Sequence, residues 1–138
     1  MNRVLTSTRS FSEADIDLCG RITNDLGSHH MKGRDGRRMA QGALTLTAVP
    51  LFAVPGVHMR EVSLTFLAPV YAGETVTASV EVTGREELAD GQVELACRVE
   101  VVNGDGKPVI TGGGVARLPS SLAESCLAEH GAPSDGAP

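Results

Sequence analysis

Hydrophobic and polar residues alternate strictly along much of the second half of the chain. The alternation covers residues 62–66, 76–82, 93–101 and 109–118. Because successive side chains of a strand point to opposite faces of a sheet, this period of two predicts four strands with one apolar face each. Turn-forming residues separate these strands at 71–74, 89–91 and 103–106, and the last two turns have hairpin chemistry. The pattern predicts an antiparallel sheet with a core on one side.

The first half of the chain has a different pattern. Residues 3–11 are rich in Val, Thr and Phe, which predicts a first strand. Ser12 and Asp15 have the spacing of a capping box, which predicts a helix from Ser12 to about Thr23. Residues 26–36 have no periodicity and predict a loop, whereas residues 43–52 are apolar nearly all round. That run predicts a buried helix, which Pro50 kinks or ends early.

These elements together predict an α+β protein. The expected arrangement is the hot-dog fold, in which an antiparallel sheet wraps around a central buried helix. One sheet of this kind leaves its edges exposed, so we expect a homodimer with a continuous sheet. We predict a single domain over residues 1–118. Residues 119–138 end in Gly, Pro and Ser with little to bury, and predict a flexible tail.

Composition limits the classes of partner. The chain has 138 residues, 41% of them hydrophobic, which is typical of one soluble globular domain. Its net charge of -5 argues against nucleic acid as a main partner, since phosphate binding needs a basic face. The sequence has no signal-peptide pattern and no apolar run of about eighteen residues, so we expect no membrane partner. Cys19, Cys97 and Cys126 form no CxxC pair, which favours a reducing cytoplasm over a zinc or disulfide framework.

Asp25 and His30 are the first candidates for chemistry. They lie in the predicted loop between two helices, and catalytic groups concentrate in loops held by a rigid scaffold. A carboxylate and an imidazole can hold one water or one substrate hydroxyl between them and exchange its proton near neutral pH. The alternative is structural: Asp25 closes the turn at Leu26 and Gly27, and His30 is simply exposed. Residue types and spacing leave both interpretations open.

A glycine and a cationic loop follow this pair. The backbone N–H of Gly42 begins the predicted buried helix, where it could stabilise a developing negative oxygen, or the glycine could merely allow tight packing. Four cations with one opposing aspartate then form a cluster that could receive the phosphates of coenzyme A or an acidic carrier protein: Lys32, Arg34, Arg37 and Arg38. A solvated loop is the alternative.

Other candidates are weaker. His29 could be the functional histidine in place of His30. His58 begins a strand, and His130 lies in the predicted tail. Cys97 has no base near it in the sequence, which argues against a thiol nucleophile. Residues 112–114 are three glycines inside a strand pattern, for which a bulge or close backbone approach is a better explanation than phosphate binding.

The sequence resembles the MaoC-like, (R)-specific enoyl-thioester hydratases over about residues 8 to 118. The matching segments occur in the same order: Phe11–Asp15, Thr23–Asp25 with His30, Gln41–Leu44, Val62–Val70 and Gly73–Ala78. The resemblance implies a hot-dog fold, usually dimeric, that interconverts trans-2-enoyl and (R)-3-hydroxyacyl thioesters of coenzyme A or acyl carrier protein. No metal or organic cofactor is implied.

The same resemblance implies roles for individual residues. Asp25 and His30 match the acid and histidine of the D-x-N-P-x-H motif and would share the water, while the Gly42 amide would hold the thioester oxygen. Gly27 and Ser28 replace the family's Asn-Pro, and Gln41 replaces the histidine that precedes the glycine. We expect Ser28, Gln41 and the four cations to contact substrate. Two further functions stay open, a hot-dog acyl thioesterase and a non-catalytic protein that binds an acyl or polyketide-like ligand.

Overall fold

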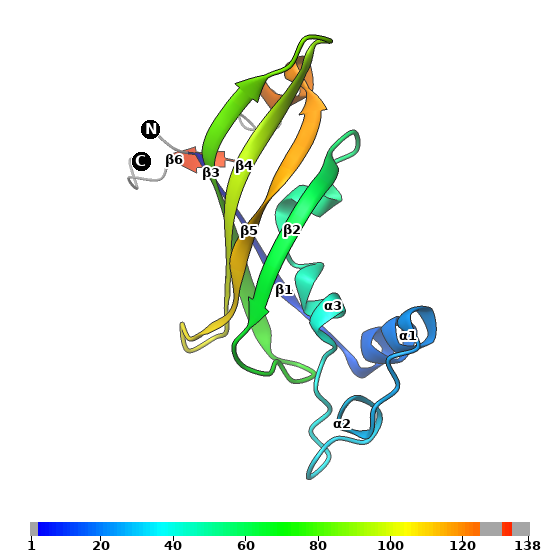
Figure 1. The fold of residues 1–138 in the computed structure, drawn as a ribbon. Coiled ribbons are helices and arrows are strands. Elements are labelled where there is room, and N and C mark those ends of the chain that lie inside the picture. The colour runs from blue at the N-terminus through cyan, green and yellow to red at the C-terminus, as the bar shows by residue number, and fades with distance from the viewer. Residues whose placement is uncertain (1–2, 125–130, 134–138) are drawn as a thin grey trace.

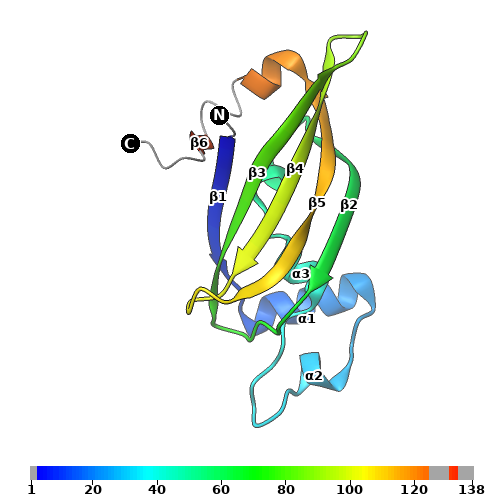
Figure 2. The ribbon, with the colours of Figure 1, turned by 60° about the vertical axis from the view of Figure 1, so that its left-hand side comes forward.

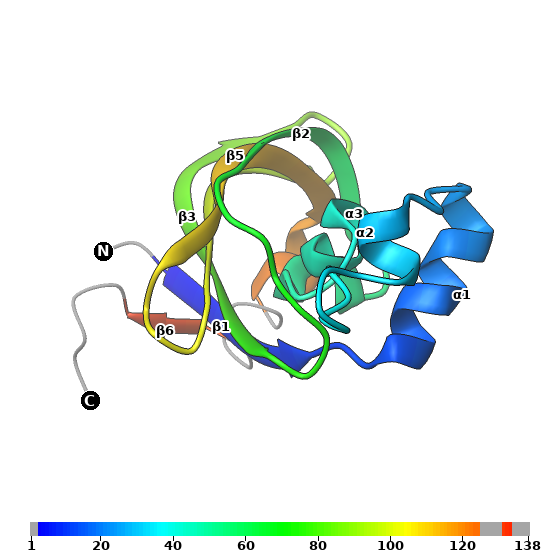
Figure 3. The same ribbon diagram turned by 90° about the horizontal axis from the view of Figure 1, so that it is seen from below.

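The computed structural model describes residues 3–124 and 131–133, in which one strongly curved antiparallel sheet has a short central helix on its inner side (Figures 1 and 2). The helices α1 (Glu13–Thr23) and α2 (Ser28–Met31) lie towards one end of the sheet. The order of the strands across the sheet is β2-β5-β4-β3-β1-β6. Their bounds are β1 Arg3–Ser10, β2 His58–Phe66, β3 Thr75–Glu87, β4 Gln92–Val102, β5 Pro108–Pro119 and β6 Gly131–Pro133. The view from below shows the sheet curled around the region of α3 (Gly42–Leu46), which is the predicted hot-dog arrangement (Figure 3).

The alternation in the sequence matches the two faces of the sheet. Along β4, every second residue from Val93 to Val101 is buried, and the residues between them face outwards. β3 follows the same rule, with Val76, Ala78 and Val80 fully buried. The core is therefore built from aliphatic side chains on the inner face, against α3 and the segment after it.

β2 differs from the prediction in length and burial. It begins at His58, four residues before the predicted strand, and it lies at the edge of the sheet. Within the described residues it pairs with β5 alone, and most of its residues are exposed, including the large apolar side chains Val62 and Phe66. The glycines of β5 explain this close pairing, since a β-carbon at Gly114 would lie 2.2 Å from the Glu61 carbonyl oxygen.

Two helices begin and end where local chemistry requires. α1 (Glu13–Thr23) begins with the predicted capping box: Asp15 N donates to Ser12 Oγ at 3.1 Å, and Ser12 N donates to Asp15 Oδ2 at 2.9 Å. α3 is shorter than the predicted apolar helix and ends at Leu46. Pro50 disfavours helical backbone at the residue before it, so Val49 is extended and the 3-10 helix η1 (Pro50–Ala53) follows.

The segment predicted as a tail contains regular structure. Residues 120–124 are helical, and β6 pairs with β1 at Arg3, Val4 and Leu5. Residues 125–130 and 134–138, with the candidates Cys126 and His130, lie outside the described residues. Among the residues that are described, no helix is long and apolar enough to cross a membrane.

Candidate active site

Asp25 and His30 face each other at the end of α1. Asn24 adopts a left-handed conformation with φ 61° that ends α1, and Asp25 N then donates to Thr23 Oγ1 at 3.2 Å. His30 belongs to the short helix α2 (Ser28–Met31), which begins directly after Gly27. The Nε2 atom of His30 lies 3.4 Å from Oδ2 of Asp25, and 6% of the histidine side chain but 49% of the aspartate side chain is exposed. A buried imidazole thus borders an accessible carboxylate.

The other ring nitrogen fixes the tautomer of His30. Nδ1 lies 2.7 Å from the carbonyl oxygen of Met39, and since a carbonyl can only accept, Nδ1 carries the proton of the neutral ring. In the neutral ring, Nε2 presents a lone pair towards the Asp25 carboxylate, which is also an acceptor. Two acceptors that face one position are suited to a molecule with two donor hydrogens, such as water.

Residues 38–41, which we call the support segment, form hydrogen bonds to Asp25 and to the helix that carries His30. Met39 N donates to His29 O at 2.9 Å, and Arg38 Nε donates to His30 O at 2.7 Å. Gln41 Nε2 lies 3.4 Å from Asp25 O and 3.0 Å from Ile16 O. The segment is itself fixed to the loop before β3, since Ala40 N donates to the Val70 carbonyl.

The pair opens into a largely apolar cleft with a volume of about 760 Å³. Its walls come from α3, from the end of β2 and from the residues that follow β2. Apart from Asp25, His30 and Gly42, the lining includes Met39, Leu46, Phe66, Leu67, Pro69 and Ile110. An apolar cleft with a few convergent polar groups is the usual form of a small-molecule site.

Gly42 borders this cleft at the first residue of α3. A β-carbon at position 42 would lie 2.7 Å from Cε1 of the Phe66 ring, so glycine allows this ring to cover the start of the helix. The predicted packing role is therefore supported by geometry. The first amides of α3 also lack acceptors within their own helix, as the oxyanion role requires.

The cationic loop forms a second hollow next to the cleft. It has a volume of about 390 Å³, and its lining includes Ser28, His29, Arg34, Arg37 and Tyr71. The guanidinium carbon of Arg37 lies 3.9 Å from the centroid of the Tyr71 ring, and Arg37 N donates to Arg34 O at 3.0 Å. Met39 lines both hollows. The tight turn thus places two arginines close to the Asp25 cleft.

Three residues that were expected to contact substrate line neither the cleft nor the second hollow. Arg38 donates to Glu13 at 3.1 Å and to Asp17 at 2.5 Å, and only 11% of its side chain is exposed. These carboxylates, Asp17 foremost, raise the pKa of Arg38 above its usual value. Gln41 is completely buried, with Oε1 unpaired among the described residues, and Lys32 is exposed but lines neither hollow. The side chains of Arg38 and Gln41 form hydrogen bonds within the protein. This structural role was not predicted from the sequence.

The remaining candidates do not compete with this pair. His29 is exposed, and its ring centroid lies 3.8 Å from that of His30. The histidine that faces Asp25 is His30. Burial raises the pKa of the Cys97 thiol to about 11, which keeps it protonated at neutral pH. Within residues 3–124 and 131–133, no cluster of His, Cys, Asp or Glu side chains could hold a metal ion.

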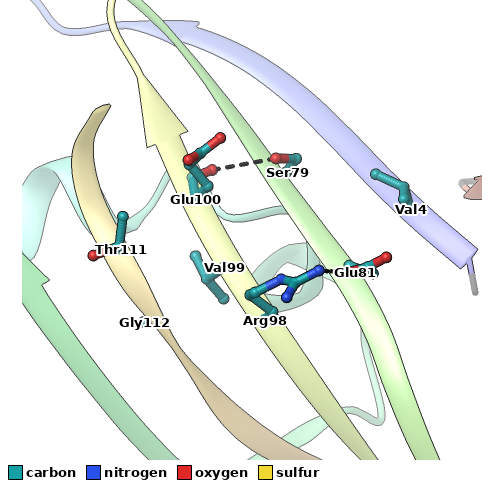
Figure 4. A pocket seen from close by; sticks show the side chains of 8 residues that line it. All are labelled: Val4, Ser79, Glu81, Arg98, Val99, Glu100, Thr111 and Gly112. Carbon is teal, nitrogen blue, oxygen red and sulfur yellow. Dashed lines mark hydrogen bonds and ion pairs between the residues drawn. The ribbon is translucent and has the colours of Figure 1, made fainter. Parts of the chain in front are cut away.

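A further hollow of about 450 Å³ lies on the outer face of the sheet, over β1, β3, β4 and β5 (Figure 4). Its polar groups bind one another: Arg98 is paired with Glu81, and Ser79 Oγ lies 3.5 Å from Glu100 O. It contains none of the candidate catalytic residues. The cleft of Asp25 and His30 is therefore the better candidate active site.

Comparison with known proteins connects the fold to one group of structures. No protein-family model and no curated protein matches the chain. The R-hydratase PhaJ1 from Pseudomonas aeruginosa is 25% identical, with a TM-score of 0.69, over 86% of this chain and 81% of that one. The (R)-hydratase from A. caviae involved in PHA biosynthesis is 22% identical, with a TM-score of 0.70, over 84% and 94%.

A third similar structure is named as a regulatory protein and not as a hydratase. It is the monoamine oxidase regulatory protein from Archaeoglobus fulgius, 24% identical with a TM-score of 0.70 over 84% of this chain and 88% of that one. MaoC-like dehydratases are also among the matches. The chain has the hot-dog fold, and its structural neighbours are MaoC-like dehydratases and (R)-hydratases.

Proposed function

We propose that the protein is a hydro-lyase that adds water to 2-enoyl thioesters or removes it from 3-hydroxyacyl thioesters. The observation that carries this proposal is the pair of acceptors, Asp25 Oδ2 and His30 Nε2, which lie 3.4 Å apart at an apolar cleft. An acyl chain fits the apolar walls, and water fits the two acceptors. The hydratases among the structural neighbours support the same chemistry.

These groups act together in one reaction. Water donates one hydrogen to the Asp25 carboxylate and the other to Nε2 of His30, and its oxygen adds to C3 of the enoyl group. The water gives up one proton to the pair, and the pair delivers one proton to C2, so that the overall change is the addition of H₂O. Negative charge moves transiently to the thioester oxygen, which we assign to the Gly42 amide at the start of α3.

We assign the carrier to the hollow of the cationic loop. Arg34 and Arg37 lie close to the cleft and are the charge-complementary partners of the phosphates in coenzyme A or in the arm of an acyl carrier protein. Ser28 adds a hydroxyl to the same hollow, and Lys32 adds positive charge on the same loop. Arg38 and Gln41 are not included in this binding set, because both are engaged within the protein.

We further propose that the protein acts as a homodimer. β2 is an edge strand with exposed Val62 and Phe66, and Phe66 also lines the cleft. A second copy that pairs along this edge would cover exposed apolar surface and narrow the open cleft. The molecular mass in solution tests this point.

The deciding experiment is a panel of enoyl and 3-hydroxyacyl thioesters followed by mass spectrometry for a gain or loss of water. We expect turnover by the wild type and none by Asp25→Asn or His30→Ala, with circular dichroism unchanged. Full activity in both variants would refute the proposal. Release of free thiol without loss of enoyl absorbance would instead identify a thioesterase. Stoichiometric binding without turnover would identify a non-catalytic acyl-binding protein, which the regulatory protein among the neighbours keeps as an alternative.

A further inference from the structure

The side chain of Arg38 is bonded both to α1 and to the main chain of His30 in α2. Its Nε atom donates to the carbonyl oxygen of His30 at 2.7 Å. Its two terminal nitrogens donate to Glu13 at 3.1 Å and to Asp17 at 2.5 Å, both on α1. Each of the three nitrogens of one partly buried guanidinium is therefore bound to a different residue.

The two sides of this junction each carry one of the reacting groups. On one side is His30, whose ring is bound to Met39, the residue next to Arg38. On the other side is α1, and Asp25 follows its end by two residues. The distance between Asp25 and His30 thus depends on how α1 is placed against α2, and Arg38 is bonded to both.

We propose that Arg38 is a positioning residue that fixes Asp25 and His30 relative to each other. This inference rests on the proposed function for its effect on catalysis, but not for its effect on the His30 ring. The planar guanidinium suits the role because its nitrogens point in fixed directions, whereas the ammonium of a lysine is a single point charge. Glu13 and Asp17 are one helical turn apart on α1 and so reach the same guanidinium.

The main test replaces Arg38 by methionine and by lysine. We expect Arg38→Met to stay folded and to lose up to about 100-fold in kcat with little change in KM, because an error of about 1 Å in a catalytic group has that effect. Arg38→Lys should recover part of kcat, since it restores the charge but not the three directed bonds.

A readout other than activity separates positioning from general stability. In the wild type, the ¹⁵N spectrum of the His30 ring, assigned with His30→Ala, should show one tautomer protonated on Nδ1. Arg38→Met should mix the tautomers, because the His30 carbonyl loses its bond to Arg38 and the ring is held less firmly against the Met39 carbonyl. This spectrum decides the inference even where no thioester is turned over, so its failure differs from failure of the proposed function.

Arg85→Met is the matched control. Arg85 also binds two carboxylates, those of Glu87 and Glu124, both at 2.7 Å, but it lies near the end of β3 and does not line the cleft. This variant should keep the wild-type kcat and His30 spectrum. If Arg38→Met gives the same kcat and the same spectrum as Arg85→Met, the inference is wrong.

A second variant covers the case in which Arg38→Met does not fold. Glu13→Gln with Asp17→Asn removes two exposed carboxylates and leaves the bond from Arg38 to His30 intact. We expect kcat to fall while His30 keeps a single tautomer, because only the position of α1 is released. An unchanged kcat in an enzyme that turns over thioesters would overturn the inference, as would a mixed-tautomer ring in the wild type.

Discussion

The ring of Phe66 lies so close over Gly42 that three of its atoms would be 2.7, 2.9 and 3.1 Å from a β-carbon at position 42. More than half of the surface of Phe66 is nevertheless exposed. The ring therefore has room to move away from the helix start. This relationship makes the role of Gly42 testable.

We predict that Gly42→Ala folds but loses roughly tenfold in turnover, because the displaced ring enters the cleft and misplaces the substrate. Steady-state kinetics on the best enoyl thioester measure the loss. Gly42→Ala with Phe66→Ala should recover the activity of Phe66→Ala alone. If the double variant stays as inactive as Gly42→Ala, the methyl group acts at the helix start and not through the ring.

Replacing the loop arginines should affect carriers that contain phosphate and spare those that do not. We expect Arg37→Ala to raise KM for a coenzyme A thioester about tenfold, the loss of one charged hydrogen bond, with kcat retained. KM for the matching N-acetylcysteamine thioester, which has no phosphate, should not change. Arg98→Ala, on the outer face of the sheet, is the control with the same loss of charge. If Arg37→Ala raised KM equally for both thioesters, the assignment of Arg37 to the phosphates of coenzyme A would be wrong.

Gln41 should contribute mainly to stability. Its side chain is completely buried and donates to the carbonyl of Ile16, with the Asp25 carbonyl also within 3.4 Å. Gln41→Met keeps the length but removes the hydrogen bonds to these two carbonyls, so we expect a loss of about 1 to 3 kcal/mol in the free energy of unfolding. Urea titration followed by circular dichroism measures this. A change below about 0.5 kcal/mol, the range of ordinary surface substitutions, would contradict it.

Cys97 should make the protein less stable at alkaline pH. Burial raises the pKa of its thiol from 9.0 to about 11, so between these values the folded chain holds a proton that the unfolded chain has lost. Stability is therefore complete below pH 9 and falls as the pH rises towards 11, by at most about 3 kcal/mol from this group. Urea unfolding from pH 8 to 11 should show a steeper decline for the wild type than for Cys97→Ala. Parallel declines would exclude the thiol as the cause.

Local patterns in the sequence predicted much of the fold. The alternation at 76–82 and 93–101 identified β3 and β4, because a side-chain period of two is a property of each strand alone. The capping box at Ser12 and Asp15 identified the start of α1 for the same reason. β2 was predicted too short, since an edge strand buries few residues and so shows little alternation outside its centre.

The candidate site was only partly accessible from the sequence. Asp25 and His30 were found because they are close in the chain and carry reactive groups. Arg38 was predicted to contact substrate. Its true partners, two carboxylates, are 21 and 25 residues away in the chain, and no local pattern connects them to it. The spacing of Glu13 and Asp17 on one face of α1 is the signal that could have predicted a cation bound there. Gln41 gave no comparable signal, since its partners are main-chain carbonyls.

The contacts from the side chains of Arg38 and Gln41 to residues 30 and 25 end on main-chain oxygens. Every amino acid has such an oxygen, so this framework does not depend on which side chains occupy the two positions. Arg38 and Gln41 therefore position the backbone of residues 30 and 25 whichever side chains stand there. A protein engineer could exchange the acid and the imidazole for other reactive groups and expect the backbone to hold them in the same places.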